Sequence, residues 1–184
     1  MFHLNTKKLF CQTAKNGLCY LKLEICMRSD KLPVYAFFFM LSAFAAFFGS
    51  MFGVDSNNEW YQNLYKPSII PPDYVFGIVW SILYVLIAIA GARIYFISKK
   101  DHKKGMTLWL SQLLVNALFS PLFFGFQSPI LGFIDTLILF ILLALLVIHI
   151  YRFEKVAFYC LLPYLAWVTF AMTISFLIMI HPFL

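Results

Sequence analysis

Charged residues are scarce in this sequence. Only 12% of its 184 residues are Asp, Glu, Lys or Arg, whereas 62% are hydrophobic and 20% are aromatic. A water-soluble domain carries roughly a quarter charged and about half apolar residues. Such an apolar excess has to face lipid rather than water, which excludes a soluble globular protein and indicates an integral protein of the lipid bilayer.

The sequence also shows no recognisable disulfide pattern and no catalytic or metal-binding motif. Cys11, Cys19 and Cys26 have spacings that match no metal motif, and Cys160 lies in an apolar run, so we expect unpaired thiols. The sequence has no glycine-rich phosphate loop and no His, Cys and carboxylate cluster with metal-ligand spacing. We therefore expect no metal, no required cofactor and no catalytic residue, which favours a non-enzymatic protein.

Five apolar stretches are long enough to cross a bilayer, since a transmembrane helix needs about 20 residues. They show no period-2 alternation, so the prediction is an all-α integral membrane bundle of five transmembrane helices and not a β-barrel. The expected helices span about 33–54, 71–97, 106–126, 129–150 and 156–180.

The basic residues, which give a formal net charge of +6, lie in the gaps between these stretches. This distribution argues against nucleic-acid binding and reflects membrane topology. With five spans, 13 of the 14 basic residues fall on the side of the N-terminus, and only Lys66 falls on the other. For a bacterial inner-membrane protein, the positive-inside rule then predicts a cytoplasmic N-terminus and an external C-terminus.

Residues 1–30 differ in composition from the membrane domain expected at 31–184. They are mixed polar and lack the 7–15-residue apolar core of a signal peptide. Met27 begins the sequence MRSDKLPVY and offers a second start site. Two interpretations stay open: residues 1–26 form a loosely ordered arm, or they are an artefact of start-site choice.

A few polar residues occur inside the spans, where each one needs a reason. Gln112, Asn116 and Phe119 share one face of the third helix, so both amides should point into the bundle. They could join helices by hydrogen bonds, or they could contact a ligand. Asp135, in the first two turns of the fourth helix, could be a structural acceptor or part of a ligand or proton path.

Aromatic and small residues also share helix faces. Trp80 and Tyr84 lie together on the second span, and Tyr164, Trp167 and Ala171 lie together on the fifth. Inward-facing rings could form a flat apolar pocket for a planar ring system, or they could be ordinary packing. In the first span, Gly49 and Gly53 form a GxxxG motif that allows close helix approach, within the chain or between two subunits.

The segment WYQNLYKPSIIPPDYVFGIVWSILY, Trp60–Tyr84, resembles the hallmark of the TspO/MBR family, the tryptophan-rich sensory proteins and translocator proteins. Two further blocks agree in order and spacing: QLLVN with SPLFFG at 112–125, and PYLAWVTFA at 163–171. GSMF, beginning at Gly49, and the position of Asp135 fit as well. The resemblance covers about residues 33–180.

This resemblance implies a five-helix bundle, often a homodimer, whose cavity is capped by the loop after the first helix. The family's cavity binds porphyrins, haem and, in some members, sterols. Here the expected ligand-binding residues are Trp80, Tyr84, Asn116, Phe119, Tyr164, Trp167 and Ala171. The expected lid includes Trp60, Tyr61, Pro67 and Pro71, and Gln112 and Asp135 are polar residues with a structural or ligand-binding role.

The sequence departs from the family pattern at several positions. Ile69, Ala117 and Phe119 stand where tryptophan is common, and Phe176 stands in place of the tyrosine near the end of the last helix. No basic residue follows Phe176 as far as Ile180, so sterol binding through the family's sterol motif is not expected.

Three functions are compatible with these residues. The first is a membrane receptor or carrier for porphyrin or haem-type tetrapyrroles, with a regulatory or transport role. The second is a light- or oxygen-dependent enzyme that degrades porphyrin, with Trp80 or Trp167 in the electron path. The third is a proton-coupled small-molecule exporter that uses Asp135.

Overall fold

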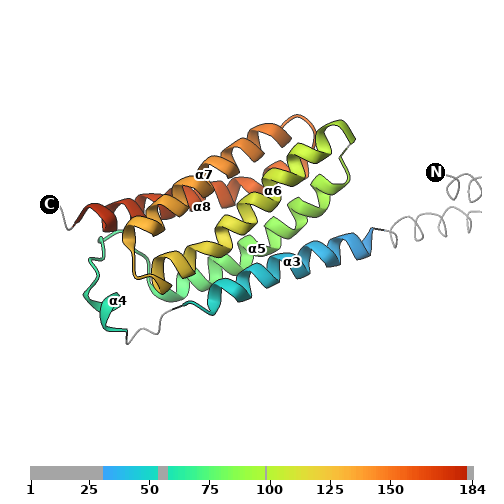
Figure 1. Ribbon diagram of the computed structural model, residues 1–184. Helices are drawn as coiled ribbons and strands as arrows, with labels where there is room; N and C mark the ends of the chain where they lie inside the picture. Colours follow the sequence, from blue (N-terminus) through green and yellow to red (C-terminus); the bar gives the residue numbers. More distant parts are fainter. Residues whose placement is uncertain (1–30, 54–57, 98, 182–184) are drawn as a thin grey trace, which may run out of the picture. The chain divides into compact units, whose positions relative to one another are not determined.

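The computed structural model describes residues 31–53, 58–97 and 99–181 (Figure 1). Over these residues the chain forms helices and no strand. In order they are α3 (Leu32–Ser50), α4 (Glu59–Asn63), α5 (Asp73–Tyr95), α6 (Lys99–Ser120), the π-helix η1 (Pro121–Gly125), α7 (Pro129–Ile150) and α8 (Lys155–Ile180). Among the described helices, α3, α5, α6 with η1, α7 and α8 are each long and apolar enough to cross a membrane. The predicted all-α fold with five spans is thereby confirmed.

By its contacts the chain divides into two units, Met1–Phe37 and Phe38–Leu184. The described part of the first unit is the start of α3. The predicted arm, residues 1–30, lies outside the described residues. The second unit holds the remainder of α3 and the other described helices, and the residues of the expected site belong to it.

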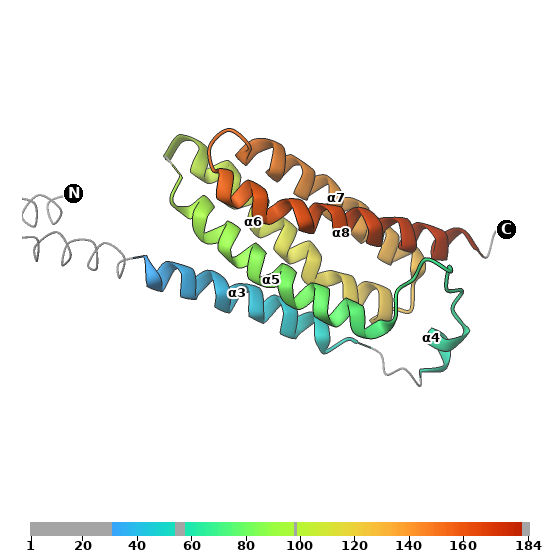
Figure 2. The ribbon, with the colours of Figure 1, turned by 180° about the vertical axis from the view of Figure 1, so that it is seen from behind.

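In the second unit, α5 to α8 form a four-helix ring (Figure 2). Helix α5 contacts α6 and α8, and α7 contacts the same two helices. Each helix of the ring carries exposed apolar side chains. Examples that are more than half exposed are Ile82 of α5, Leu114 of α6, Ile148 of α7 and Tyr159 of α8. In water these side chains would be unfavourably placed, but acyl chains accommodate them.

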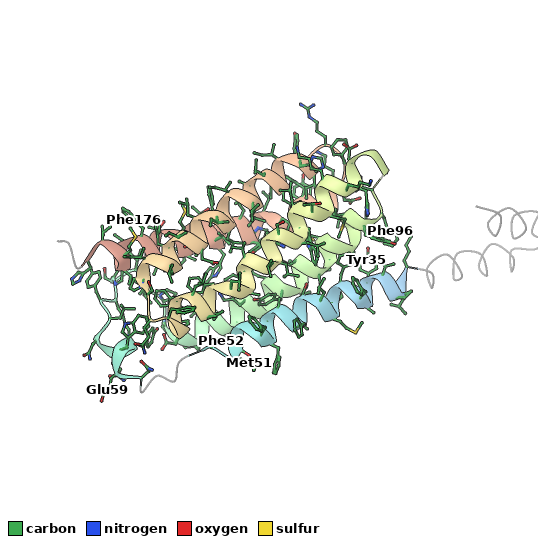
Figure 3. The ribbon with its side chains drawn as sticks, viewed as in Figure 1. Tyr35, Met51, Phe52, Glu59, Phe96 and Phe176 are labelled. Carbon is green, nitrogen blue, oxygen red and sulfur yellow. The ribbon has the colours of Figure 1, made fainter. Side chains whose placement is uncertain are left out.

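Helix α4 and the described residues that follow it, up to α5, lie at the end of the ring where α5 begins and α8 ends (Figure 2). Glu59 of α4 and Phe176 of α8 lie toward this end, and Phe96 marks the opposite one (Figure 3). We call the first the lid end, because the predicted lid residues lie there.

A close contact of α5 with α3 and α6 surrounds Gly91. The buried indole of Trp109 in α6 donates a hydrogen bond to the Ile87 carbonyl oxygen at 3.0 Å. The ring of Phe38 in α3 meets Trp109 edge-on, with centroids 5.0 Å apart. A Cβ on Gly91 would lie 2.5 Å from Trp109 and 2.6 Å from Phe38. The absence of a side chain at Gly91 therefore lets three helices meet here.

Gly49, the first glycine of the predicted GxxxG motif, has a neighbour within this chain, whereas Gly53 lies beyond the end of α3. A Cβ on Gly49 would lie 3.7 Å from the Ser120 Oγ of α6, which is an ordinary contact distance. Ser42 and Ala45, farther along α3, are buried as well. Of the two alternatives that the sequence leaves open, Gly49 thus supports packing inside the chain.

Local sequence features mark the starts of α7 and α8 and the turn before α7. The Ser128 hydroxyl accepts a hydrogen bond from the Leu131 N–H and so caps α7, whose first residue is Pro129. Glu154 caps α8 and forms an ion pair at 2.9 Å with Arg93, near the end of α5. Gln127, in the turn before α7, has a φ of 50°, a left-handed conformation in which glycine is usual.

Three features of the helices differ from the sequence-based expectation: α3 ends at Ser50 and not near residue 54, α6 begins earlier, and α4 was not predicted. Helix α6 begins at Lys99, about two turns before the predicted start at residue 106. Its first turns are charged, and a helix that projects beyond the hydrocarbon does not need apolar residues there. Helix α4 was not expected, because five residues are too few to show an apolar period. Asn58 caps α4 by accepting the Tyr61 N–H.

Candidate functional site

An aromatic cluster occupies the lid end of the second unit. Its buried members are Phe123, Ile174 and Ile178, and the ring of Phe119 stacks on Phe123 with centroids 5.4 Å apart. The partly buried side chains packed against these are Trp60, Leu64, Ile70, Phe76, Phe119, Phe124 and Phe170. The lid end cluster therefore combines residues from the lid with residues from α5, α6, η1 and α8.

The predicted lid residues lie against this cluster or near it. Trp60 meets Phe123 edge-on at 5.6 Å, and Pro67 is buried. Pro71 is half-buried just before α5. The lid also stacks on the end of α8, because the rings of Tyr65 and His181 are nearly parallel with centroids 3.7 Å apart. These contacts hold the described part of the lid over the end of the ring.

Tyr61 ties the lid to the start of α5. Its hydroxyl donates a long hydrogen bond, 3.3 Å, to the Asp73 carboxylate. The ammonium of Lys66 lies 4.1 Å from the centre of the Tyr61 ring. Burial raises the pKa of the Tyr61 phenol above its ordinary value, and the Asp73 carboxylate raises it further. The phenol therefore keeps its proton at neutral pH and remains a donor.

A hydrogen-bonded chain crosses the middle of the ring. The Tyr84 hydroxyl donates to Asn116 Oδ1 at 2.7 Å, and Asn116 Nδ2 donates to the Tyr164 hydroxyl oxygen at 3.0 Å. Tyr164 in turn donates to Gln112 Oε1 at 3.0 Å. Gln112, Asn116 and Tyr164 are all buried. These bonds join α5, α6 and α8, which is the interhelical role that the sequence left open for the two amides.

Replacing Tyr164 with phenylalanine is expected to lower the free energy of unfolding by about 1–2 kcal/mol. The change removes two interhelical hydrogen bonds and leaves a buried donor on Asn116 and a buried acceptor on Gln112. Thermal unfolding in detergent would measure it. Tyr159→Phe, at a 65% exposed position of the same helix, is the control and should have little effect. Equal stability of the two variants would contradict a stabilising role for this chain.

The two tryptophans predicted to bind ligand have different surroundings. Trp80 contacts Tyr84 and Tyr164, with ring centroids 5.7 and 6.0 Å apart, so it lies beside the polar chain. Trp167 instead contacts Phe76 at 5.6 Å and Phe170 at 5.5 Å, two members of the lid end cluster. The indole nitrogen of Trp167 is buried and has no hydrogen-bond partner among the described residues.

A groove of about 580 Å³ lies between α5 and α8. Pockets of this size commonly hold small molecules. Its lining is almost wholly apolar and consists of Val79, Ile82, Leu83, Leu86, Pro163, Ala166, Trp167 and Phe170. Among the residues predicted to bind ligand, only Trp167 lines this groove. The remaining lining residues carry no sequence signal, because Val, Leu and Ala are common in every membrane helix.

Ala171 and Asp135 complete the set of expected residues. Ala171 is half-buried on α8, one turn beyond Trp167. Asp135 of α7 is only 4% exposed, and its Oδ2 atom has no hydrogen-bond partner within the described part of the chain. A buried carboxylate without a donor is a position where a ligand or a proton could bind. No three His, Cys, Asp or Glu residues of residues 31–53, 58–97 and 99–181 lie close enough to hold a metal ion.

Comparison with known proteins gives consistent matches over this region. The sequence model of the TspO/MBR family matches residues 37–180. The chain is 37% identical to the tryptophan-rich protein TspO of Chlorobaculum tepidum, over 72% of this chain and 85% of the relative. The TspO of Archaeoglobus fulgidus is 36% identical, with 72% and 86% covered. The translocator protein of Homo sapiens is 30% identical, with 76% and 84% covered.

Proposed function

Since this chain belongs to the TspO/MBR family of multi-pass membrane proteins, we propose that it is a receptor or carrier for porphyrin or haem-type tetrapyrroles. Two relatives bear the names tryptophan-rich sensory protein and translocator protein, which fit a regulatory or transport role. The observation that carries the proposal is the position of Trp167. It lines the α5–α8 groove and also contacts Phe76 and Phe170 of the lid end cluster.

The proposed binding uses apolar burial and ring contacts and makes no covalent bond. Trp80, Trp167 and Phe119 supply flat surfaces, and Trp60 covers the cluster from the lid side. At about 25 cal/mol per Å² of apolar area, enclosing a planar ring system can outweigh the cost of association. We expect micromolar affinity, which corresponds to about −8 kcal/mol.

Titration of the purified protein with protoporphyrin IX in the dark tests this function. Saturable quenching of tryptophan fluorescence at micromolar concentration is expected, because Trp80 and Trp167 lie among the proposed contacts. A lipid-exposed tryptophan in an unrelated detergent-solubilised membrane protein is the control for unspecific quenching. Quenching that rises without saturation and matches the control would contradict the proposal.

The same purified protein can be used to test the two alternative functions. Illuminating the complex would bleach the porphyrin absorption band if the protein degrades its ligand, and the Trp80–Tyr84–Tyr164 contacts offer an electron path for such a reaction.

A proton-coupled exporter would instead show pH-driven flux from vesicles that Asp135→Asn abolishes. The observation in its favour is the buried carboxylate of Asp135, whose Oδ2 atom has no hydrogen-bond partner among the described residues. A stable porphyrin absorption band and no pH-driven flux would support ligand binding without degradation or transport.

We further propose a cytoplasmic N-terminus and an external C-terminus, and, from the family resemblance, a homodimer. The orientation is based on the basic residues, 13 of which fall on the N-terminal side. Labelling Lys103→Cys and Lys66→Cys with a membrane-impermeant maleimide in intact cells would test it. Only the Lys66→Cys variant should react, because residue 66 is predicted to lie on the external side.

A further inference from the structure

The α5–α8 groove faces away from the polar chain and toward the membrane. Two of its lining residues, Ile82 and Ala166, are exposed on spans whose exposed surfaces meet acyl chains. Trp167 lies near the middle of α8, roughly 18 Å from either end of the helix at 1.5 Å per residue. At that depth neither water nor lipid headgroups reach the groove. Whatever fills it comes from the hydrocarbon of the bilayer.

Only a thin wall of side chains separates this groove from the lid end cluster. Trp167 and Phe170 line the groove, and both also contact rings of the cluster or belong to it. The wall has no hydrogen bond at its centre, because the Trp167 indole nitrogen finds no acceptor among the described residues. Ring contacts of this kind add little to the stabilisation that comes from area burial.

The backbone beside Trp167 is also less constrained than the rest of α8. Pro163 lies inside the helix and lines the groove. Proline has no N–H, so the Tyr159 carbonyl lacks its helical donor and the helix has one hydrogen bond fewer beside the groove.

The lid side is more firmly closed. Trp60, Leu64 and Ile70 pack on the cluster, Pro67 is buried, and Tyr65 stacks on His181. The Tyr61–Asp73 hydrogen bond adds a polar link at the rim. Passage from water through this end would have to break several contacts together, whereas passage from the bilayer displaces one tryptophan and one phenylalanine.

We propose that the α5–α8 groove is the membrane-side entry site for the ligand, a flat apolar ring system dissolved in the bilayer, with the Trp167 side chain as its movable wall. The entry site rests on the proposed binding function and adds the route that the ligand takes. The groove accepts the apolar edge of the ring system, and rotation of Trp167 admits it toward the cluster. The lining is apolar and offers no partner to charged groups of the ligand.

Narrowing the groove from either wall tests the route. Ala166→Phe on α8 and Ile82→Phe on α5 place a ring in the opening, and Leu145→Phe, at an exposed position of α7 outside the groove, is the matched control. Tyr65→Ala removes the stack between the lid and His181. Protoporphyrin IX is delivered from lipid vesicles to reconstituted protein by stopped flow, and the equilibrium Kd is measured in parallel.

Each groove variant should slow association and dissociation together by about tenfold, with Kd changed less than threefold, because a narrowed route affects both directions equally. Leu145→Phe and Tyr65→Ala should leave the association rate unchanged. Normal association in both groove variants overturns the entry site, whatever Tyr65→Ala does. A weaker Kd at an unchanged association rate also overturns it, since the groove would then be part of the bound site. Absence of saturable binding by the unaltered protein overturns the receptor function itself.

Discussion

Replacing Trp167 with alanine is expected to weaken the binding of protoporphyrin IX about ten- to a hundredfold, or ~1.4–2.8 kcal/mol. Trp167 contacts Phe76 and Phe170 of the lid end cluster, so its loss removes a ring contact to the bound ligand and opens the wall beside the cluster. Fluorescence titration in the dark would measure the change, with the remaining tryptophans as reporters.

Two further variants make the result specific to the site. Tyr159→Ala removes an aromatic ring from an exposed position of the same helix and should leave Kd unchanged. Trp167→Phe keeps a ring without the indole nitrogen and should lose about half of the binding energy that alanine loses. An alanine variant that binds as tightly as the unaltered protein would remove Trp167 from the binding site.

Replacing Gly91 with alanine is expected to lower the free energy of unfolding by about 2–3 kcal/mol. The added Cβ would lie 2.5 Å from Trp109 and 2.6 Å from Phe38, and both rings are buried. Trp109 has little freedom to move, since its indole is bonded to the Ile87 carbonyl oxygen. Helices α3, α5 and α6 would therefore have to separate, which thermal unfolding in detergent would detect.

Gly77, on the same helix, provides the matched control. A Cβ there would meet no atom within 4 Å, and its position is exposed. Gly77→Ala should be neutral or stabilising by up to ~1 kcal/mol, because alanine is the better helix former. If both variants unfold at the same temperature, close packing at Gly91 does not limit the stability of the bundle.

Much of the membrane domain was predictable because its signals are local. Long apolar runs define the spans, and Pro129 marks the start of α7 within one residue. The face that carries Gln112 and Asn116 follows from helical periodicity, and both side chains are buried. Their partners were not predictable, since Tyr84 and Tyr164 come from other helices and the bonds depend on the order of helices in the ring.

The groove and the close contact at Gly91 were missed for a related reason. Leu83, Leu86 and Ala166 resemble any other apolar residue of a membrane helix, and only the distance between α5 and α8 makes them a lining. Gly91 sits in a run of small and aliphatic residues with no turn or motif to single it out. The start of α6 was placed too late because its charged first turns resemble a loop.

The hydrogen-bonded chain has a consequence for how this protein is made. Its central hydroxyl belongs to Tyr164 on α8, the last of the described helices to leave the ribosome, whereas both amides lie on α6. Until α8 inserts, Asn116 can bond only to Tyr84 of α5, and Gln112 lacks the hydroxyl of Tyr164 that later donates to it. Biogenesis is therefore expected to have a late checkpoint, at which arrival of the final helix converts a group of inserted segments into a mature bundle.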